Sequence, residues 1–275
     1  MPESNAKASS RPSRRAYLLI TLFAFALVLL PFLFWYDTWF GRRLTDAQIE
    51  KYLRPDDKPR RAQQALVQIG ERMSRGDPGA RQWYPRIIAL ASHPAAEMRM
   101  TAAWIMGQDP RHAAFREPLH RLFADRSALV RRNASLALAA FGDPAGRVEL
   151  RAMLRSHVLE SPRDGTVKYR LKAGDYVNPG TLVARVGGAE LRAELPGELR
   201  RRLQPDGARV APGAPLAEFS PDDAHAWEAL RALYLVGGRD DLEEVQRWAR
   251  GGPKGSEKLR RQSEATARRI ASRSP

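Results

Sequence analysis

Residues that could carry chemistry are few in this 275-residue chain, and their spacing does not group them. The chain contains no cysteine, which excludes disulfides, thiolate catalysis, zinc–thiolate sites and iron–sulfur clusters. The histidines form no His-x-x-x-His and no pair on one helical turn, so the sequence predicts structural or exposed histidines rather than metal ligands. The five are His93, His112, His120, His157 and His225.

Neighbouring carboxylates are the other candidates for acid–base chemistry. Three pairs occur where helices are expected to start, and there they complement the helix macrodipole, which predicts caps rather than catalysts: Asp222 with Asp223, Asp240 with Asp241, and Glu243 with Glu244. No Gly-x-Ser-x-Gly elbow occurs, and the stretch at 250–256 lacks both the spacing of a phosphate-binding loop and a preceding strand. We therefore expect no catalytic residue, no cofactor, no metal and no small-molecule substrate.

Arginine dominates a formal net charge of +15. Such a balance points to nucleic acid, an anionic membrane surface or acidic partners. Because the arginines are spread along the chain, the sequence favours a solvated basic surface, and no nucleic-acid partner is expected. The candidates for binding an acidic protein partner are Arg99, Arg131 and Arg132. The alternative is pairing inside the fold with Asp109, Asp125 and Asp143.

Pairs of helices are expected to position these arginines. The motif MRMTAAWIMGQDP at 98–110 returns as VRRNASLALAAFGDP at 130–144, and each copy is followed by a segment with a leucine-rich helical face. Small residues let paired helices approach closely, and Asp-Pro starts the next helix because proline has no amide proton to lose there. The pattern resembles HEAT repeats, which implies stacked helix pairs with an extended binding surface. Three pairs precede residue 157, and a fourth, degenerate pair follows at 221–250.

A different, doubled pattern fills residues 158–220. The run SPRDGTVKYRLKAGDYVNPGTLVARV, which starts at residue 161, is followed 32 to 33 residues later by a looser copy. Alternating runs separated by glycine turns predict short strands that close into a small sandwich. The matched glycines are Gly165 with Gly197, Gly174 with Gly207, and Gly180 with Gly213.

This doubled pattern resembles the biotinyl/lipoyl-like barrel-sandwich hybrid of membrane fusion proteins; an unrelated small β-domain is the alternative. Carrier members of that family bear a modified lysine on the hairpin that joins the two halves. No lysine occurs here between Lys172 and Lys254. We therefore expect a non-carrier domain without biotin or lipoate.

The N-terminal region carries the longest uncharged run. Residues 1–15 are polar and basic and are expected to be disordered. Ala16 to Tyr36 has no charge, and its 21 residues would reach about 31 Å as a helix, against a hydrocarbon core of roughly 30 Å. We expect a transmembrane helix over 16–40, rather than a cleavable signal peptide, because no small-x-small site follows. The basic tail favours a cytoplasmic N-terminus and a periplasmic or otherwise extracytoplasmic bulk.

The predicted fold class is α+β multidomain: an N-terminal transmembrane helix, then an α-solenoid of HEAT-like helix pairs interrupted by a small all-β barrel-sandwich hybrid. The predicted divisions are 1–15, 16–40, 44–157 for the repeats, 158–220 for the β-domain, 221–250 for the last pair and 251–275 for a basic tail. The predicted function is a non-catalytic, membrane-anchored scaffold, adaptor or accessory subunit whose partner is an integral membrane or cell-envelope complex. The alternatives are a component of an export system, a subunit of a respiratory or photosynthetic complex, and, in a different class, a lyase or carrier-domain enzyme.

Overall fold

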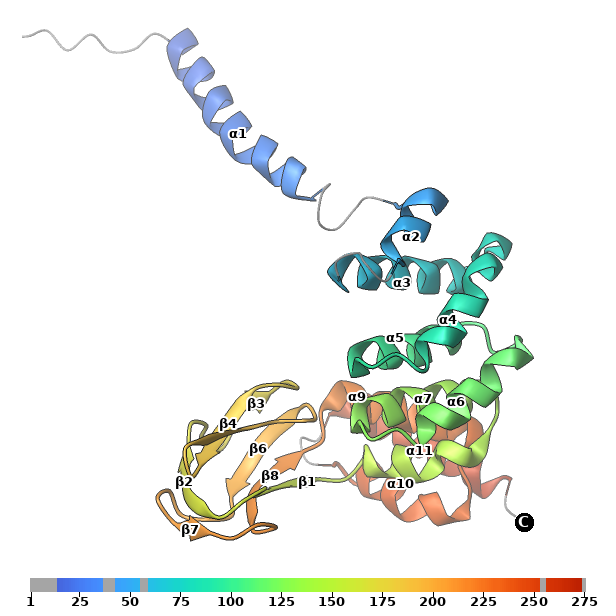
Figure 1. Ribbon diagram of the computed structural model, residues 1–275, viewed down its shortest axis with the longest axis vertical. Coiled ribbons are helices and arrows are strands. Elements are labelled where there is room, and N and C mark those ends of the chain that lie inside the picture. Colours follow the sequence, from blue (N-terminus) through green and yellow to red (C-terminus); the bar gives the residue numbers. More distant parts are fainter. Residues whose placement is uncertain (1–13, 37–42, 55–58, 253–255, 274–275) are drawn as a thin grey trace, which may run out of the picture. The chain divides into compact units, whose positions relative to one another are not determined.

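A computed structural model describes residues 14–36, 43–54, 59–252 and 256–273 of the chain (Figure 1). The chain divides into two compact units, Met1–Lys51 and Tyr52–Pro275. Most of the tail at 1–15 that was predicted to be disordered lies outside the described residues.

The first unit contains the helix α1 (Arg14–Tyr36) and all but the last residue of α2 (Asp46–Tyr52). Immediately before α2, the Thr45 N–H donates to Gln48 Oε1 at 3.0 Å, and the Gln48 N–H donates to Thr45 Oγ1 at 3.3 Å. This reciprocal pair is a capping box, which satisfies two backbone donors at the helix start. The sequence Thr-Asp-Ala-Gln is typical of such a helix start.

Among the described residues, no helix is long and apolar enough to cross a membrane. On this finding the prediction of a transmembrane helix over 16–40 is wrong, and residues 37–40 of the predicted span lie outside the described residues. The same correction applies to the predicted fold class, in so far as it included that helix, and to the predicted single-pass location. The described residues form a mixed fold of helices and antiparallel sheets.

The α-helices of the second unit stack in two rows. The first row is α3, α5, α7, α9 and α11, which pack side by side, and α4, α6, α8 and α10 pack behind them. Short 3₁₀ turns precede the second-row helices, and Asp77 and Asp143 cap two of these turns by accepting the N–H groups of Gly79 and Ala145. Of the two Asp-Pro pairs in the predicted motif, Asp143-Pro144 therefore starts a helical turn as expected. After Asp109-Pro110 the 3₁₀ turn begins only at Ala113, with His112 as its N-cap residue.

The bounds of these helices are α3 Pro59–Ser74, α4 Tyr84–Leu90, α5 Ala96–Met106, α6 Arg116–Phe123, α7 Ala128–Ala140, α8 Arg147–Ala152, α9 Asp223–Val236, α10 Leu242–Ala249 and α11 Glu257–Ala271. The 3₁₀ turns are η2 Pro78–Trp83, η3 Ala113–Phe115, η4 Pro144–Gly146 and η5 Arg239–Asp241.

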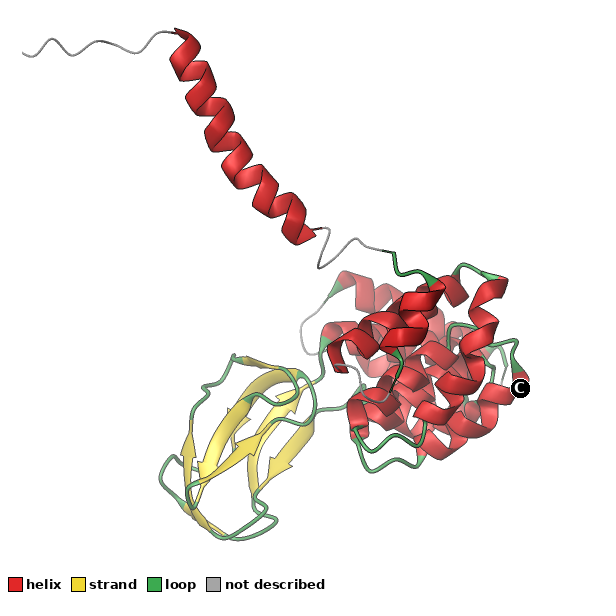
Figure 2. Cartoon of the chain, turned by 45° about the horizontal axis from the view of Figure 1, so that its top comes forward, coloured by secondary structure: helices red, strands yellow, loops and turns green. Residues whose placement is uncertain are grey.

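Two four-stranded antiparallel sheets lie between α8 and α9 in the chain (Figure 2). Their strands are β1 His157–Glu160, β2 Gly165–Tyr169, β3 Tyr176–Val177, β4 Leu182–Val186, β5 Ala189–Arg192, β6 Gly197–Arg202, β7 Arg209–Val210 and β8 Pro215–Ser220. The strand orders are β1-β8-β6-β3 and β5-β4-β2-β7. Exchanging each strand for its counterpart in the other half of the doubled sequence converts one order into the other. Each sheet therefore takes strands from both halves.

Hydrogen bonds repeat this internal symmetry. Gly174 N–H donates to the Leu199 carbonyl, and Gly207 N–H donates to the Val167 carbonyl, both at 2.8 Å. Both glycines have positive φ, +93° and +82°, which glycine adopts without steric cost. The doubled sequence pattern is thus a doubled set of turns and strands. The resemblance to the biotinyl/lipoyl-like family stays a prediction.

The helices and the sheets have separate cores. One core is built from strand residues such as Val167, Val183, Leu199, Leu216 and Phe219. The other contains helix residues that come before the sheets in the chain, Leu150 and Leu154, and others that come after them, Leu230, Val245 and Trp248. The helices on both sides of the sheets therefore share one apolar core.

Residues 257–271 lie in the segment that the sequence analysis described only as a basic tail. They form α11, which packs against α9 and α10. Its buried face consists of Leu259, Ser263, Thr266 and Ile270. This buried face is hard to recognise in the sequence because two of its four residues are polar. In the structure the Thr266 hydroxyl donates a hydrogen bond to the Leu230 carbonyl at 2.9 Å.

Candidate functional site

Arg99 lies in the first turn of α5 and is buried. Its Nε and Nη2 donate to the two carboxylate oxygens of Asp125 at 2.6 and 2.9 Å, and its Nη1 donates to the His93 and Pro94 carbonyls, both at 2.8 Å. The hydrogen bond from Arg99 lowers the pKa of Asp125, although burial opposes this shift. This pairing is one of those that the alternative interpretation predicted.

Arg131 occupies the equivalent place in α7. Its Nη1 donates to the Asp125 and Arg126 carbonyls at 2.9 and 3.2 Å, six and five residues earlier, as Arg99 does in its own repeat. Its Nε donates to Glu149 at 3.1 Å. Arg132 is buried, its Nε lies 3.5 Å from Glu149, and burial lowers its pKa. A partner-binding role for the three arginines stays a prediction, and the structure gives each a carboxylate within its own chain.

Asp109 and Asp143 reach back to the preceding repeat instead of pairing with these arginines. Asp109 accepts a hydrogen bond from the Tyr84 hydroxyl at 2.8 Å, and Asp143 lies 2.9 Å from His120 Nε2. Burial, with the hydrogen bond to Asp109, raises the pKa of Tyr84 to about 12, which keeps the hydroxyl a donor. The aspartates of both turns thus connect successive helix pairs.

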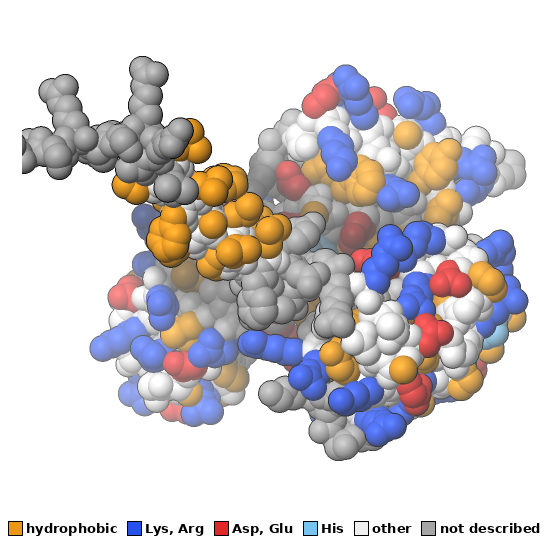
Figure 3. Space-filling view, turned by 90° about the horizontal axis from the view of Figure 1, so that it is seen from above, with side chains coloured by type: hydrophobic (Ala, Val, Ile, Leu, Met, Phe, Trp, Pro, Cys, Tyr) orange, Lys and Arg blue, Asp and Glu red, His pale blue; other side chains and the backbone are white. Residues whose placement is uncertain are grey.

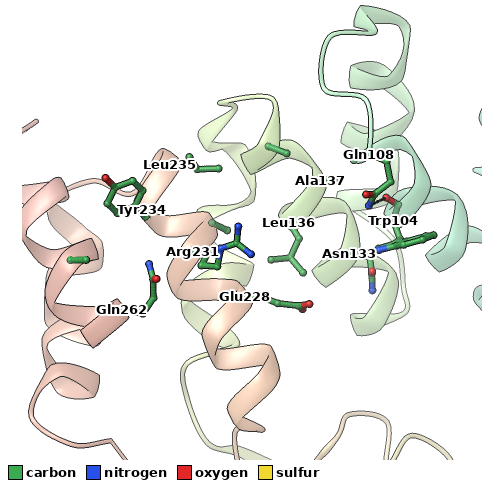
Figure 4. A pocket seen from close by; sticks show the side chains of 14 residues that line it. Trp104, Gln108, Asn133, Leu136, Ala137, Glu228, Arg231, Tyr234, Leu235 and Gln262 are labelled. Carbon is green, nitrogen blue, oxygen red and sulfur yellow. Dashed lines mark hydrogen bonds between the residues drawn. The ribbon is translucent and has the colours of Figure 1, made fainter. Parts of the chain in front are cut away.

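A groove of about 800 Å³ crosses the exposed faces of α5, α7, α9 and α11 (Figure 4). Most of its lining residues recur at fixed distances from the N-cap residue of each helix, which places them on one helical face. They are Asn133, Glu228 and Gln262 six residues on; Trp104, Leu136, Arg231 and Ala265 nine on; Ala137 and Ala232 ten on; and Gln108, Ala140 and Leu235 thirteen on. By this register α11 continues the row as the first helix of a further unit.

Small residues form the floor of the groove and large ones its walls. Gly107, Ala137 and Ala232 keep the floor low, and a Cβ added at Gly107 would lie 3.0 Å from the Cβ of Ala137. Trp104 is 38 % exposed, Tyr234 39 % and Leu235 50 %. Large apolar surfaces left exposed around a concavity mark interaction sites.

Two amide side chains in the groove have a defined orientation. Asn133 Nδ2 donates to the Leu129 carbonyl at 3.0 Å, and Gln108 Nε2 donates to the Trp104 carbonyl at 3.1 Å. A carbonyl oxygen can only accept, so the nitrogen of each amide must face it. Each amide keeps one C=O and one N–H for a ligand. A polypeptide backbone offers the matching donor and acceptor at every non-proline residue.

Cations surround the aromatic side chains at one end of the groove. Arg231 Cζ lies 4.6 Å and Lys258 Nζ 4.1 Å from the centroid of the Trp227 ring, and Arg269 Cζ lies 5.9 Å from the Tyr234 ring. Cation–π contacts of this length are attractive. Elsewhere, basic side chains are spread over the face in Figure 3 rather than gathered into one patch.

The titratable clusters offer no comparable site. Within the described ranges, no group of three or more His, Cys, Asp or Glu side chains could hold a metal ion. His157 stacks on Phe219 with ring centroids 5.2 Å apart. Burial, assisted by the charge of Arg132, lowers the pKa of His157 to about 4, so the ring is neutral at pH 7. We interpret this histidine as part of the packing.

The sequence analysis did not predict the groove because it considered charged residues near the repeated turns of the motif. A signal was present in the repeat register. Arg99 and Arg131 lie four residues after the N-cap, whereas Trp104, Leu136 and Arg231 lie nine after it, about 140° further around a helix of 3.6 residues per turn. Aligning the repeats by their N-caps would have separated the buried face from the open one.

Comparison with known proteins agrees with this repeat architecture. Residues 84–165 match the family model of HEAT repeats. No curated protein matches the chain. The helix pairs within this stretch are therefore HEAT-like, and repeats of this kind indicate a role in protein interaction.

Proposed function

We propose that this protein is a non-catalytic scaffold or accessory subunit that binds a protein partner in the groove across α5, α7, α9 and α11. The observation that carries the proposal is the recurrence of the lining residues at the same register in all four helices. A surface repeated from helix to helix suits a ligand that extends along the row, as a polypeptide does.

The composition of the groove supports a protein ligand. Trp, Tyr and Arg are the residue types enriched at binding hot spots, and Trp104, Tyr234 and Arg231 supply all three. The amides of Gln108 and Asn133 can bind a peptide backbone. The export-system and respiratory or photosynthetic interpretations depended on a membrane anchor and are not part of this proposal.

Site-specific photo-crosslinking tests the proposal. A photoreactive phenylalanine analogue replaces Tyr234 in the groove or, as the control, Val148 on α8, which is 63 % exposed outside it. Both proteins are made at native level in the source cells and irradiated. We expect a discrete crosslinked protein from position 234 and none from position 148. Equal labelling at both positions, or none at 234, contradicts the proposal.

A further inference from the structure

The groove is electrically divided along its length. At the α9–α11 end, Arg231 lines the groove, and Glu228 is the one carboxylate among the described lining residues. Lys258 shares the Trp227 ring with Arg231, and Arg269 contacts the lining residue Tyr234. At the α5–α7 end, the described lining residues are uncharged and include Trp104. A ligand that complements this surface carries negative charge at one end and apolar side chains at the other.

The cationic groups of Arg231, Lys258 and Arg269 contact aromatic rings rather than carboxylates. Arg231 and Lys258 both contact the Trp227 ring, and Arg269 contacts Tyr234. No ion pair joins any of the three to a carboxylate of the described residues, in contrast to Arg99 or Arg260. Their charges are therefore available to a ligand, and the ring contacts reduce the side-chain entropy lost on binding.

We propose that the groove binds an extended, acidic segment of a partner protein, with its carboxylates over α9 and α11 and its apolar side chains over α5 and α7. The inference rests on the proposed function and adds the chemistry of the partner. Packed helices lie 8–10 Å apart, so four of them span roughly 27 Å. About eight residues of extended chain cover that distance at roughly 3.3 Å each.

The distribution of charge favours a polypeptide over a single-stranded nucleic acid. A nucleic acid carries a phosphate at each nucleotide and needs cations along its whole path. Here the cations are confined to one end, and the carboxylate of Glu228 lies beside them. A polypeptide can place its acidic residues at one end only.

Peptide selection with a blocked groove tests the inference. A random 12-residue display library is selected against the full chain and then screened against Ala140→Trp, which fills the groove from an exposed position. The control is Ala152→Trp at an exposed position of α8 outside the groove. We expect peptides that bind the wild type and Ala152→Trp but not Ala140→Trp, with Asp or Glu clustered at one end and apolar residues at the other. Circular dichroism establishes that both variants are folded.

Charge removal then tests the acidic assignment. Arg231→Gln with Lys258→Gln removes the two cations that contact the Trp227 ring. Lys168→Gln with Arg209→Gln removes two exposed cations from the sheets. Fluorescence anisotropy of a selected peptide should give roughly tenfold weaker binding to the first variant, a difference that shrinks at high salt. The second variant should bind as the wild type does.

Failure of the inference can be distinguished from failure of the proposed function. Groove-dependent peptides without acidic residues, unaffected by the charge variant, overturn the acidic partner and leave the scaffold intact. Peptides that bind Ala140→Trp as well as the wild type contradict the groove itself. Competition by a 20-nucleotide oligo(dT) at equal concentration, or dimerisation of the protein through the groove, identifies another occupant and overturns the inference.

Discussion

At the scale of single residues, Arg99 shows how a repeat uses one side chain to join several segments. It forms two hydrogen bonds with Asp125 and donates to two backbone carbonyls while buried. Arg99→Ala leaves the carboxylate and both carbonyls without this donor, so we expect a loss of about 3 kcal/mol in the free energy of unfolding. Urea denaturation measures it. Arg121→Ala, which breaks an exposed ion pair with Glu117, should cost less than about 1 kcal/mol.

The same experiment separates the two interpretations of the candidate arginines. An Arg99→Ala protein that keeps its stability and loses its crosslinked partner would assign Arg99 to an interface. Charge reversal at Arg131 and Arg132 extends the comparison, because Glu149 lies near both side chains. We expect that variant to melt at a lower temperature.

His157 gives the fold a pH dependence of known sign. Burial lowers its folded-state pKa from 6.5 to about 4, so the unfolded chain takes up the proton first as the pH falls. The stability contributed by the neutral ring is complete above pH 6.5 and is lost as the pH falls toward 4, at up to about 1.4 kcal/mol per pH unit. His157→Phe keeps an aromatic ring beside Phe219 and should flatten this slope. Equal slopes in urea titrations of both proteins between pH 6.5 and 4 would contradict the assignment.

At the scale of elements, the sheets occupy the position of a loop between repeats. His157 lies 32 residues, one repeat length, after Asp125. Asp222 is the N-cap residue of α9, and Ser127 is the N-cap residue of α7. His157 also pairs with Phe219 across β1 and β8, so the strands enter and leave side by side. Joining His157 directly to Pro221 would give a loop of the same length as Asp125 to Ser127.

This geometry predicts that the sheets can be removed. A chain without residues 158–220 should keep the helical core, because no strand residue belongs to it. We expect one cooperative thermal transition by far-ultraviolet circular dichroism, with a Tm within about 8 °C of the full chain, a shift that corresponds to roughly 2 kcal/mol. Aggregation of the shortened chain, or loss of its helical signal, would show that the strands support the repeats.

The sequence predicts these elements where local chemistry decides them. The Asp143-Pro144 turn, the Thr45 capping box and the doubled glycine turns each need a particular residue type, and each is present in the structure. The prediction from sequence fails at α11, where tertiary packing buries the polar residues Ser263 and Thr266. The predicted membrane helix depended on the length of an uncharged run and on the missing cleavage site, neither of which fixes local geometry.

At the scale of the whole molecule, the candidate groove could not be predicted from motifs because it belongs to no single repeat. Trp104 comes from α5 and Gln262 from α11, more than 150 residues apart, with the sheets between them in the chain. Its existence depends on α9 packing against α7 across that interruption. The connection between the two sets of helices is therefore a condition for the proposed function.

Asp241 holds this connection at the second row of helices. It is fully buried, accepts hydrogen bonds from Arg147 Nε at 2.7 Å and the Gly238 N–H at 2.8 Å, and lies 3.4 Å from Arg151 Nη1. Arg147 and Arg151 come from α8, before the sheets, and Asp241 directly precedes α10, after them. A single carboxylate thus joins segments about 90 residues apart.

Asp241→Asn should weaken the connection without changing side-chain volume. Removing the negative charge leaves two arginines facing a neutral amide, and we expect a loss of about 2 kcal/mol. The lost interactions all lie at the contact between α8 and the start of α10. Hydrogen exchange should therefore show α10 and α11 losing protection before α5 and α7. Asp240→Asn is the matched control, since that side chain is 81 % exposed and lies 3.8 Å from Arg147, and it should change stability by less than about 0.5 kcal/mol. If α10 and α5 exchange at equal rates in Asp241→Asn, the helices on the two sides of the sheets are held together by their shared apolar core rather than by this carboxylate.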